Sequence, residues 1–336
     1  MAKNLQQKIY KGSILAAILL AFLVVSLGAY TRLVHGGLGC PDWPGCYGQL
    51  TVPETTETIK KAAELYPDQP LDSKKAWVEM IHRYAAGTLG LLILAIFILA
   101  ALRDREPNQN RILPYVLPLL VIFQAVLGMW TVTWLLLPLV VMGHLLGGLS
   151  ILACLWWLGL NAWAPRQLEL PKKFKPWVVM GLAIVIIQLV LGGWTSTNYA
   201  ALVCLDFPLC HGHLIPEMDL KGGFDFSAPI GANYQGGVLD IPARVAIQMV
   251  HRYWAGVVAL YVGLLAIMVF AFAKTRVTRG VGMLTLAVLA GQISLGMLNI
   301  LRVLPVGIAV AHNNGAALLL LCLITLAFAA FHQTEG

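Results

Sequence analysis

Four long stretches of this sequence contain no Asp, Glu, Lys or Arg, and they constrain the fold more than any other feature. They lie between Arg111 and Arg166, Lys175 and Asp206, Arg279 and Arg302, and Arg302 and Glu335. Each is longer than the roughly 20 residues that an α-helix needs to span a bilayer. A soluble domain of 336 residues would carry more surface charge than the 12% found here. The sequence therefore excludes a soluble enzyme, a disordered chain and a secreted disulfide scaffold.

The apolar segments predict an all-α membrane protein with eight transmembrane helices. Their approximate ranges are 13–31, 80–102, 112–133, 138–160, 177–195, 246–273, 280–301 and 306–331. The first segment is not interpreted as a cleaved signal peptide, because seven further spans follow it and no small-residue cleavage site stands out. An even number of spans places both termini on one side of the membrane.

The distribution of charge predicts which side that is. The N-terminal segment and the loops 103–111, 161–176 and 274–279 carry 13 basic residues, and with the C-terminal tail this face has only four acids. The opposite face has 10 basic and 12 acidic residues. Because Lys and Arg concentrate in cytoplasmic loops, we expect cytoplasmic termini. The long loops at about 32–79 and 196–245 then lie outside, folded as caps over the bundle. The net charge of +7 is the sum of these two faces, and it does not indicate a nucleic-acid partner.

An internal repeat aligns the two halves of the chain at an offset of 168–169 residues. Residues 82–87 match 251–256, 124–129 match 292–297, His144 with Gly147 matches His312 with Gly315, and Cys154 matches Cys322. At an offset of 164, Leu27, Gly28, Thr31, Cys40 and Cys46 match Leu191, Gly192, Thr195, Cys204 and Cys210. We predict two four-helix bundles, residues 1–165 and 166–336, related by a pseudo-twofold axis along the membrane normal.

Four of the eight histidines fall inside the predicted spans, each near the start of an even-numbered helix. They are His82, His144, His251 and His312. All four should lie at a similar shallow depth on the outer side, where ionisable groups are costly and usually functional. Glycines accompany them and would let a bulky group approach: Gly87, Gly90, Gly143, Gly147, Gly148, Gly256 and Gly315.

Two histidines from the second and fourth helices of one bundle could face each other across a flat macrocycle, as in bis-imidazole haem ligation. Interhelical hydrogen bonding is the alternative for any single histidine. Four histidines that are paired by a repeat favour haem. A zinc site is less favoured, since no third or fourth ligand lies at matching depth. His35, His211, His213 and His332 lie in loops or the tail and receive no role.

The repeat breaks beside the histidines. Glu79 lies three residues before His82, on the same helix face, whereas Gln248 takes this position before His251. The carboxylate could act as a general base, orient water or stabilise positive charge on a substrate. The alternative is an interfacial acid at a helix start, favoured by the macrodipole. The asymmetry favours function, with a reactive N-terminal bundle and a fixed cofactor site in the C-terminal bundle.

Arginines and cysteines complete the candidate residues. Arg83 and Arg252 follow two of the histidines, and either pair with haem propionates or snorkel to the interface. The pairs Cys40–Cys46 and Cys204–Cys210 lie in the outer loops, which favours one local disulfide in each; the first pair also allows a redox role. Cys154 and Cys322 are interpreted as packing residues. No CxxCH motif is present, so any haem would be bound non-covalently.

As a set, these residues resemble the haem A synthase family, including its mitochondrial counterpart, over essentially all eight spans. The matching residues are Glu79-Met80-Ile81-His82-Arg83, His144, His251-Arg252, His312, Gly28-Ala29-Tyr30-Thr31-Arg32, and Cys40 with Cys46. The resemblance implies an oxidoreductase of the bacterial inner membrane. It would oxidise the C8 methyl group of haem O through an alcohol and a gem-diol to the formyl group of haem A.

The resemblance also implies roles for individual residues. His82 and His144 would flank the substrate haem, with Glu79 assisting the chemistry, and His251 and His312 would ligate a resident haem b. Loop cysteine pairs occur in part of the family, which fits disulfides Cys40–Cys46 and Cys204–Cys210. Haem O and the lipid bilayer are the implied partners. Complexes with a haem O synthase, an oxidase-assembly factor or a second copy of the chain would leave no trace in the sequence.

Two other functions are compatible with paired histidines. A quinol-linked di-haem cytochrome b would transfer electrons without chemistry on the haem itself, but it gives no reason for Glu79 opposite Gln248. A haem-delivery or assembly protein is the second alternative. The identity of the haems extracted from the protein distinguishes all three.

Overall fold

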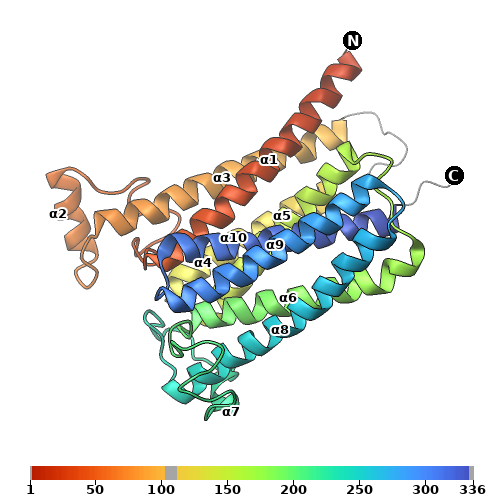
Figure 1. Cartoon of the computed structure of the whole chain (residues 1–336). Helices are drawn as coiled ribbons and strands as arrows, with labels where there is room; N and C mark the ends of the chain where they lie inside the picture. The colour runs from red at the N-terminus through yellow and green to blue at the C-terminus, as the bar shows by residue number, and fades with distance from the viewer. Residues whose placement is uncertain (1, 103–111, 333–336) are drawn as a thin grey trace.

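The computed structural model of the chain describes residues 2–102 and 112–332, and these residues form helices and no strand. Eight of the helices are long and apolar enough to cross a membrane, which confirms the predicted number of spans (Figure 1). They are α1 (Ala2–Leu33), α3 (Ser73–Leu102), α4 (Leu113–Thr133), α5 (Pro138–Trp163), α6 (Lys175–Thr197), α8 (Ile241–Phe272), α9 (Arg276–Leu301) and α10 (Val306–Phe331).

Three spanning helices begin well before their predicted positions. α1 starts at Ala2, eleven residues before the predicted position 13. α3 starts at Ser73 and α8 at Ile241, seven and five residues before the predicted positions 80 and 246. The first turns of α3 are polar, so an apolar pattern does not mark them. α8 carries a local start signal, because Asp240 accepts a hydrogen bond from the Ala243 amide at 3.0 Å. α3 and α8 therefore extend beyond their apolar segments, into the long loops.

Three short helices lie outside the spans. α2 (Thr56–Leu65) and α7 (Leu220–Gly223) belong to the two long loops, and the 3-10 helix η1 (Lys172–Phe174) precedes α6. The long loops lie at one end of the molecule and both chain ends lie at the other (Figure 1). We call these the loop end and the termini end. The functional candidates concentrate at the loop end.

The spanning helices contact one another in two closed rings. α1 contacts α3, α3 contacts α4, α4 contacts α5, and α5 contacts α1; α6, α8, α9 and α10 repeat this order. Contacts between the rings join α1 with α10, α5 with α6, and α5 with α10. Each ring has its own buried apolar cluster, and residues of α10 contribute to both clusters. α10 is the most deeply buried span as a result.

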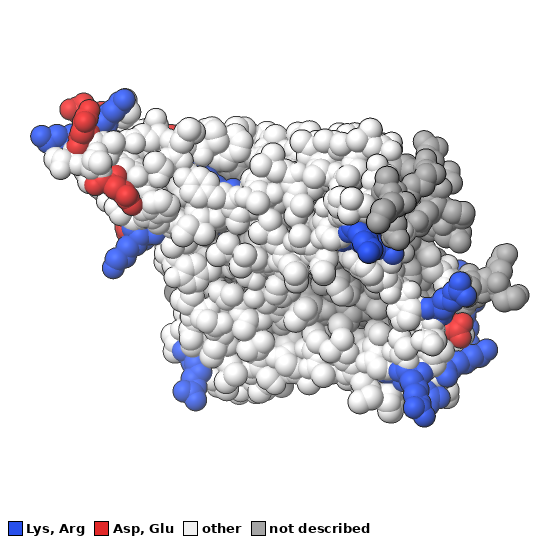
Figure 2. All heavy atoms as spheres, turned by 90° about the horizontal axis from the view of Figure 1, so that it is seen from above, with Lys and Arg blue, Asp and Glu red and all other residues white. Residues whose placement is uncertain are grey.

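Charged side chains lie mainly towards the two ends of the molecule on the face that Figure 2 shows, with a broad uncharged band between them. This is the surface expected for a chain whose middle is surrounded by lipid. Six residues of the charge count lie outside the described residues: Arg103, Asp104, Arg105, Glu106, Arg111 and Glu335.

Candidate functional site

Each of the four span histidines packs against a glycine of a neighbouring helix. A Cβ atom added to the glycine would lie 3.0 to 3.2 Å from the Cε1 atom of the ring in all four places. Carbon atoms in optimal contact are about 3.5–4.0 Å apart, so only glycine fits without displacing the ring. The pairs are Gly28 (α1) with His82 (α3), Gly128 (α4) with His144 (α5), Gly192 (α6) with His251 (α8), and Gly296 (α9) with His312 (α10).

These four glycines are functional candidates that the sequence reasoning missed, although the repeat contained the signal. Gly28 matches Gly192, and Gly128 matches Gly296, in the aligned segments. The reasoning instead singled out glycines on the histidines' own helices. Of those, Gly87 and Gly256 have no atom within 4 Å of an added Cβ, so they support no ring.

The first-half histidines face each other closely. The ring centroids of His82 and His144 are 6.4 Å apart and the ring planes are nearly perpendicular, at 80°. A metal–imidazole nitrogen bond is about 2 Å long, so two rings that ligate one iron from opposite sides have centroids on the order of 6 Å apart. The spacing of His82 and His144 fits a single iron between them.

Three of the four span histidines have one ring nitrogen without a partner among the described residues. The Nδ1 atoms of His82, His144 and His312 are buried and have no hydrogen-bond partner within the described chain. The backbone carbonyls of Val24, Gln124 and Gln292 lie beside these rings, but the geometry falls short of a hydrogen bond. A small rotation would pair each Nδ1–H with its carbonyl, the usual arrangement when Nε2 ligates a metal.

Glutamines accompany three of the four histidines. Gln124 Nε2 donates to the His144 carbonyl at 2.6 Å, and Gln292 Nε2 lies 3.4 Å from His312 Nε2. Gln188 Nε2 lies 3.2 Å from His251 Nδ1. His82 is the exception, because the position that corresponds to Gln188 in the first half is Val24. In the described part of the chain, His82 therefore lacks the glutamine neighbour that the other three histidines have.

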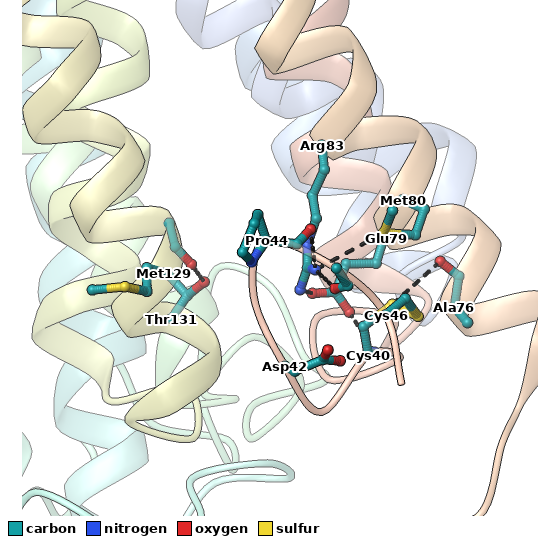
Figure 3. Close-up of polar contacts among 12 residues, drawn as sticks. Cys40, Asp42, Pro44, Cys46, Ala76, Glu79, Met80, Arg83, Met129 and Thr131 are labelled. Atoms are coloured by element: carbon teal, nitrogen blue, oxygen red, sulfur yellow. Dashed lines mark hydrogen bonds and ion pairs between the residues drawn. A yellow bond between two sulfur atoms is a disulfide. The ribbon is translucent and has the colours of Figure 1, made fainter. Parts of the chain in front are cut away.

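Glu79 is buried, with 5% of its surface exposed, and it joins α3 to the first long loop (Figure 3). One carboxylate oxygen accepts from the Cys40 amide at 3.0 Å and the other pairs with Arg83 at 2.6 Å. The alternative of an interfacial acid at a helix start is wrong. Glu79 is the seventh residue of α3, whereas macrodipole stabilisation falls off within the first turn.

Gln248 performs the same anchoring in the second half without a charge. Its Oε1 accepts from the Cys204 amide at 2.8 Å, and its Nε2 donates to the Ala201 carbonyl at 2.7 Å. An amide is therefore sufficient to hold such a loop. The negative charge of Glu79 is an addition that loop anchoring does not require.

The two arginines bind loop carbonyls. Arg83 donates to the carbonyls of Pro44 and Gly45 as well as to Glu79. Arg252 donates to the carbonyls of Cys204, Asp206 and Leu209 at 2.7–2.9 Å. Their guanidinium groups hold the loops in place, so neither snorkelling nor a propionate partner is needed to explain them.

Each of the two long loops contains a disulfide-bonded turn of the same structure. Disulfides join Cys40 to Cys46 and Cys204 to Cys210. Inside each turn an aspartate accepts two amides: Asp42 from Tyr47 and Gly48 at 2.6 and 2.9 Å, and Asp206 from His211 and Gly212 at 3.0 and 2.9 Å. The Gly212 amide contributes most to lowering the pKa of Asp206. The sequence reasoning missed both aspartates, although they correspond at the offset of 164.

The remaining histidines lie apart from these sites. His35 stacks on Tyr199 with centroids 5.8 Å apart, and burial lowers the pKa of His35. His332 stacks on Phe328 at the termini end. Among the residues that the structure describes, no three or more His, Cys, Asp or Glu side chains form a metal-binding group. Of the four span histidines, His82 and His144 form a ring contact.

Comparison with known proteins agrees with these features. The sequence profile of the cytochrome oxidase assembly protein family (COX15-CtaA) matches residues 13–324. The Heme A synthase of Shewanella oneidensis is 42% identical over 318 residues, covering 94% of each chain. The Heme A synthases of Caulobacter sp. and Caulobacter vibrioides are 30% and 29% identical over 333 and 335 residues, covering 92% and 91% of each chain.

Proposed function

This chain belongs to the cytochrome oxidase assembly protein family (COX15-CtaA), and from that membership we propose that it is a haem A synthase, an oxidoreductase acting on haem O. The observation that carries this proposal is the 42% identity to a Heme A synthase along 94% of both chains. The chain is a multi-pass membrane protein, so its substrate is delivered in or at the bilayer.

We propose that the two rings of helices are pseudo-symmetric four-helix bundles, within residues 1–165 and 166–336. The same order of contacts in both rings supports this division. His35 and Tyr199 correspond at the offset of 164 and stack on each other. A residue that touches its own counterpart lies next to a twofold axis. The proposed axis therefore passes between the ends of α1 and α6.

The substrate haem O is proposed to bind in the first half, between His82 and His144. The 6.4 Å spacing of the rings and their buried, unpartnered Nδ1 atoms support this placement. Gly28 and Gly128 fix the two rings from behind. Their close packing would hold both imidazoles in position for the macrocycle.

A resident haem b is proposed for the second half, on His251 and His312. Gly192 and Gly296 pack against these rings as in the first half. Gln188 and Gln292 lie near a ring nitrogen of each histidine. When bound, this haem supplies a route for the electrons that leave the substrate.

Glu79 is proposed to assist the oxidation. Oxidation of a methyl group develops positive charge on a carbon joined to the macrocycle, and a nearby carboxylate stabilises such charge most strongly in a site that excludes water. Hydrogen bonds from Cys40 and Arg83 hold the carboxylate rigidly in this half. The neutral Gln248 in the other half fits a site where no substrate reacts.

We further propose cytoplasmic termini, with the loop end outside, in a bacterial inner membrane. Lys172, Lys173, Arg276 and Arg279 lie at or next to the starts of α6 and α9, on the termini end of the molecule. This concentration of cations follows the positive-inside rule. A haem O synthase is the class of enzyme that must supply the substrate.

The test is to express the chain with a source of haem O and to identify the extracted haems by chromatography. We expect haem A together with haem B. Haem B alone would favour a cytochrome b that transfers electrons. Unchanged haem O carried by the protein would favour a haem-delivery role.

A further inference from the structure

One segment of the second long loop crosses from its own half to the first half. Residues 224–239, which we call the strap, connect α7 to α8 and pack on the turn between α4 and α5. Resting on the proposed function, we infer that the strap closes the substrate site and retains the alcohol intermediate between the two oxidations. Tyr234 is its positioning residue.

Tyr234 anchors the strap to the first half. Only 3% of its surface is exposed, and it packs among Leu127, Leu136, Leu137 and Val140. Its amide donates to the Leu135 carbonyl at 3.0 Å, and its hydroxyl donates to the Pro229 carbonyl within the strap at 2.7 Å. One side chain thus fixes both the shape of the strap and its contact with the α4–α5 turn.

This contact lies next to the substrate site. Val140 is four residues before His144 in α5, which places it about one turn away on the same face, a rise of about 6 Å. Leu127 adjoins Gly128, the glycine against which His144 packs. The strap therefore covers the loop end of the site, about one helical turn from His144.

The ends of the strap are fixed to the second half. Phe226 packs on Trp194 of α6 with centroids 4.9 Å apart, and the Trp194 indole donates to the Gly223 carbonyl at 2.8 Å. Gly237 has a positive φ of 84°, and an added Cβ would lie 3.1 Å from the Asn198 carbonyl. The strap is consequently a bridge, held at both ends by one half and at its middle by the other.

Within the described residues, no strap packs on the equivalent turn of the second half. Leu135 and Leu136 correspond to Val303 and Leu304, and all four have φ between 48° and 64°. Yet Leu136 is buried whereas its counterpart Leu304 is half-buried, and Leu135 is half-buried whereas its counterpart Val303 is 61% exposed. The cover is therefore not required by the turn itself. It is confined to the half in which the substrate is proposed to react.

A closed cover has a specific use in a reaction with two successive oxidations. The alcohol formed first must stay in the site to be oxidised again, and a lid keeps such an intermediate from leaving and excludes bulk water. The resident haem in the other half needs no release and no lid. This difference accounts for the one-sided strap.

The first measurement is hydrogen exchange of the two turns in the full-length protein. The Leu136 amide donates to the Thr131 carbonyl at 2.8 Å and the Leu304 amide to the Asn299 carbonyl at 2.7 Å, so their hydrogen bonds are matched. We expect slower exchange at Leu136. Tyr234→Ala should speed exchange at Leu136 on the order of 100-fold and leave Leu304 unchanged. Equal exchange of both amides in the unmodified protein would overturn the inference.

The second measurement is the ratio of alcohol to formyl haem extracted from cells that supply haem O. Tyr234→Ala should raise this ratio severalfold, whereas Tyr234→Phe should stay near the unmodified protein because the ring remains. Gly237→Ala, which strains the strap at its other anchor, should give the same rise if Tyr234→Ala fails to fold. The absorption of the resident haem reports folding in each variant.

The outcomes separate the two proposals. An unchanged ratio in variants whose Leu136 amide exchanges faster would overturn the strap alone. An unmodified protein that forms neither alcohol nor formyl haem would overturn the proposed function, and the strap's role with it.

Discussion

The packing of His312 on Gly296 makes the substitution Gly296→Ala a direct test of the second haem site. The added Cβ would lie 3.0 Å from His312 Cε1, against a contact optimum of about 3.5–4.0 Å. The ring must therefore shift by a few tenths of an ångström, whereas metal–ligand distances are kept within about 0.2 Å. A shift that relieves the overlap with the added Cβ would move the His312 ring out of its position for ligating iron.

The magnitude follows from this overlap. Inserting a methyl group into a tightly packed place costs about 1–3 kcal/mol. Most of this cost falls on the haem-bound state, in which the iron prevents the ring from moving away. Haem affinity at His251 and His312 should fall about 5- to 150-fold. The helix propensity gained by replacing Gly with Ala is shared by the free and bound states, so it does not enter the affinity.

Gly291→Ala is the matched control on the same helix. An added Cβ at Gly291 meets no atom within 4 Å, so this variant should keep its haem and gain up to about 1 kcal/mol of helix stability. The assay is haem content per protein after purification, with the absorption spectrum as a check on ligation. Full haem content and an unchanged spectrum in Gly296→Ala would refute the role assigned to the glycine.

Three further predictions address the remaining site residues. Glu79→Gln should keep the Cys40 hydrogen bond and the resident haem, as an amide does in the second half, yet form no formyl haem; normal haem A in the extract would make Glu79 structural. His251→Ala should lose the resident haem, and an unchanged haem spectrum would rule out that ligand. The hydrogen bond from the Gly212 amide lowers the pKa of Asp206. The stabilisation from this bond is therefore fully present above the ordinary aspartate pKa of about 3.9. It is lost as the pH falls through the lowered pKa that Asp206 has in the folded loop. Amide exchange at Gly212 should therefore speed up only in strong acid, and Asp206→Asn should abolish that pH dependence.

Hydropathy predicted the spans well because lipid imposes a strong and local requirement on composition. The number of spans and most of their ends followed from apolar length alone. The starts of α1, α3 and α8 did not, because helices that leave the bilayer become polar while keeping their hydrogen bonds. At Asp240 a capping residue was a readable signal that hydropathy ignores.

The candidate site was only partly predictable. The histidines stood out because a titratable group is rare in a span. The glycines behind them are ordinary residues in membrane helices, and only the repeat connects Gly28 with Gly192. The partners of Glu79 could not be predicted, since Cys40 is 39 residues away and the contact depends on how the loop folds back. The strap is harder still, because residues 224–239 and the α4–α5 turn are about 90 residues apart and no sequence pattern links them.

The central position of α10 has a consequence for how the protein is made. α10 contacts both rings of helices, and its residues complete both apolar clusters. It also follows the other seven spans in the chain, so it leaves the ribosome after them. Until it inserts, α1 and α5 lack a neighbour, and His251 lacks the histidine proposed to share its haem, His312. If His251 and His312 hold the resident haem as proposed, that haem can be loaded only onto a chain whose synthesis has passed α10, which separates its delivery from the insertion of the earlier spans in time.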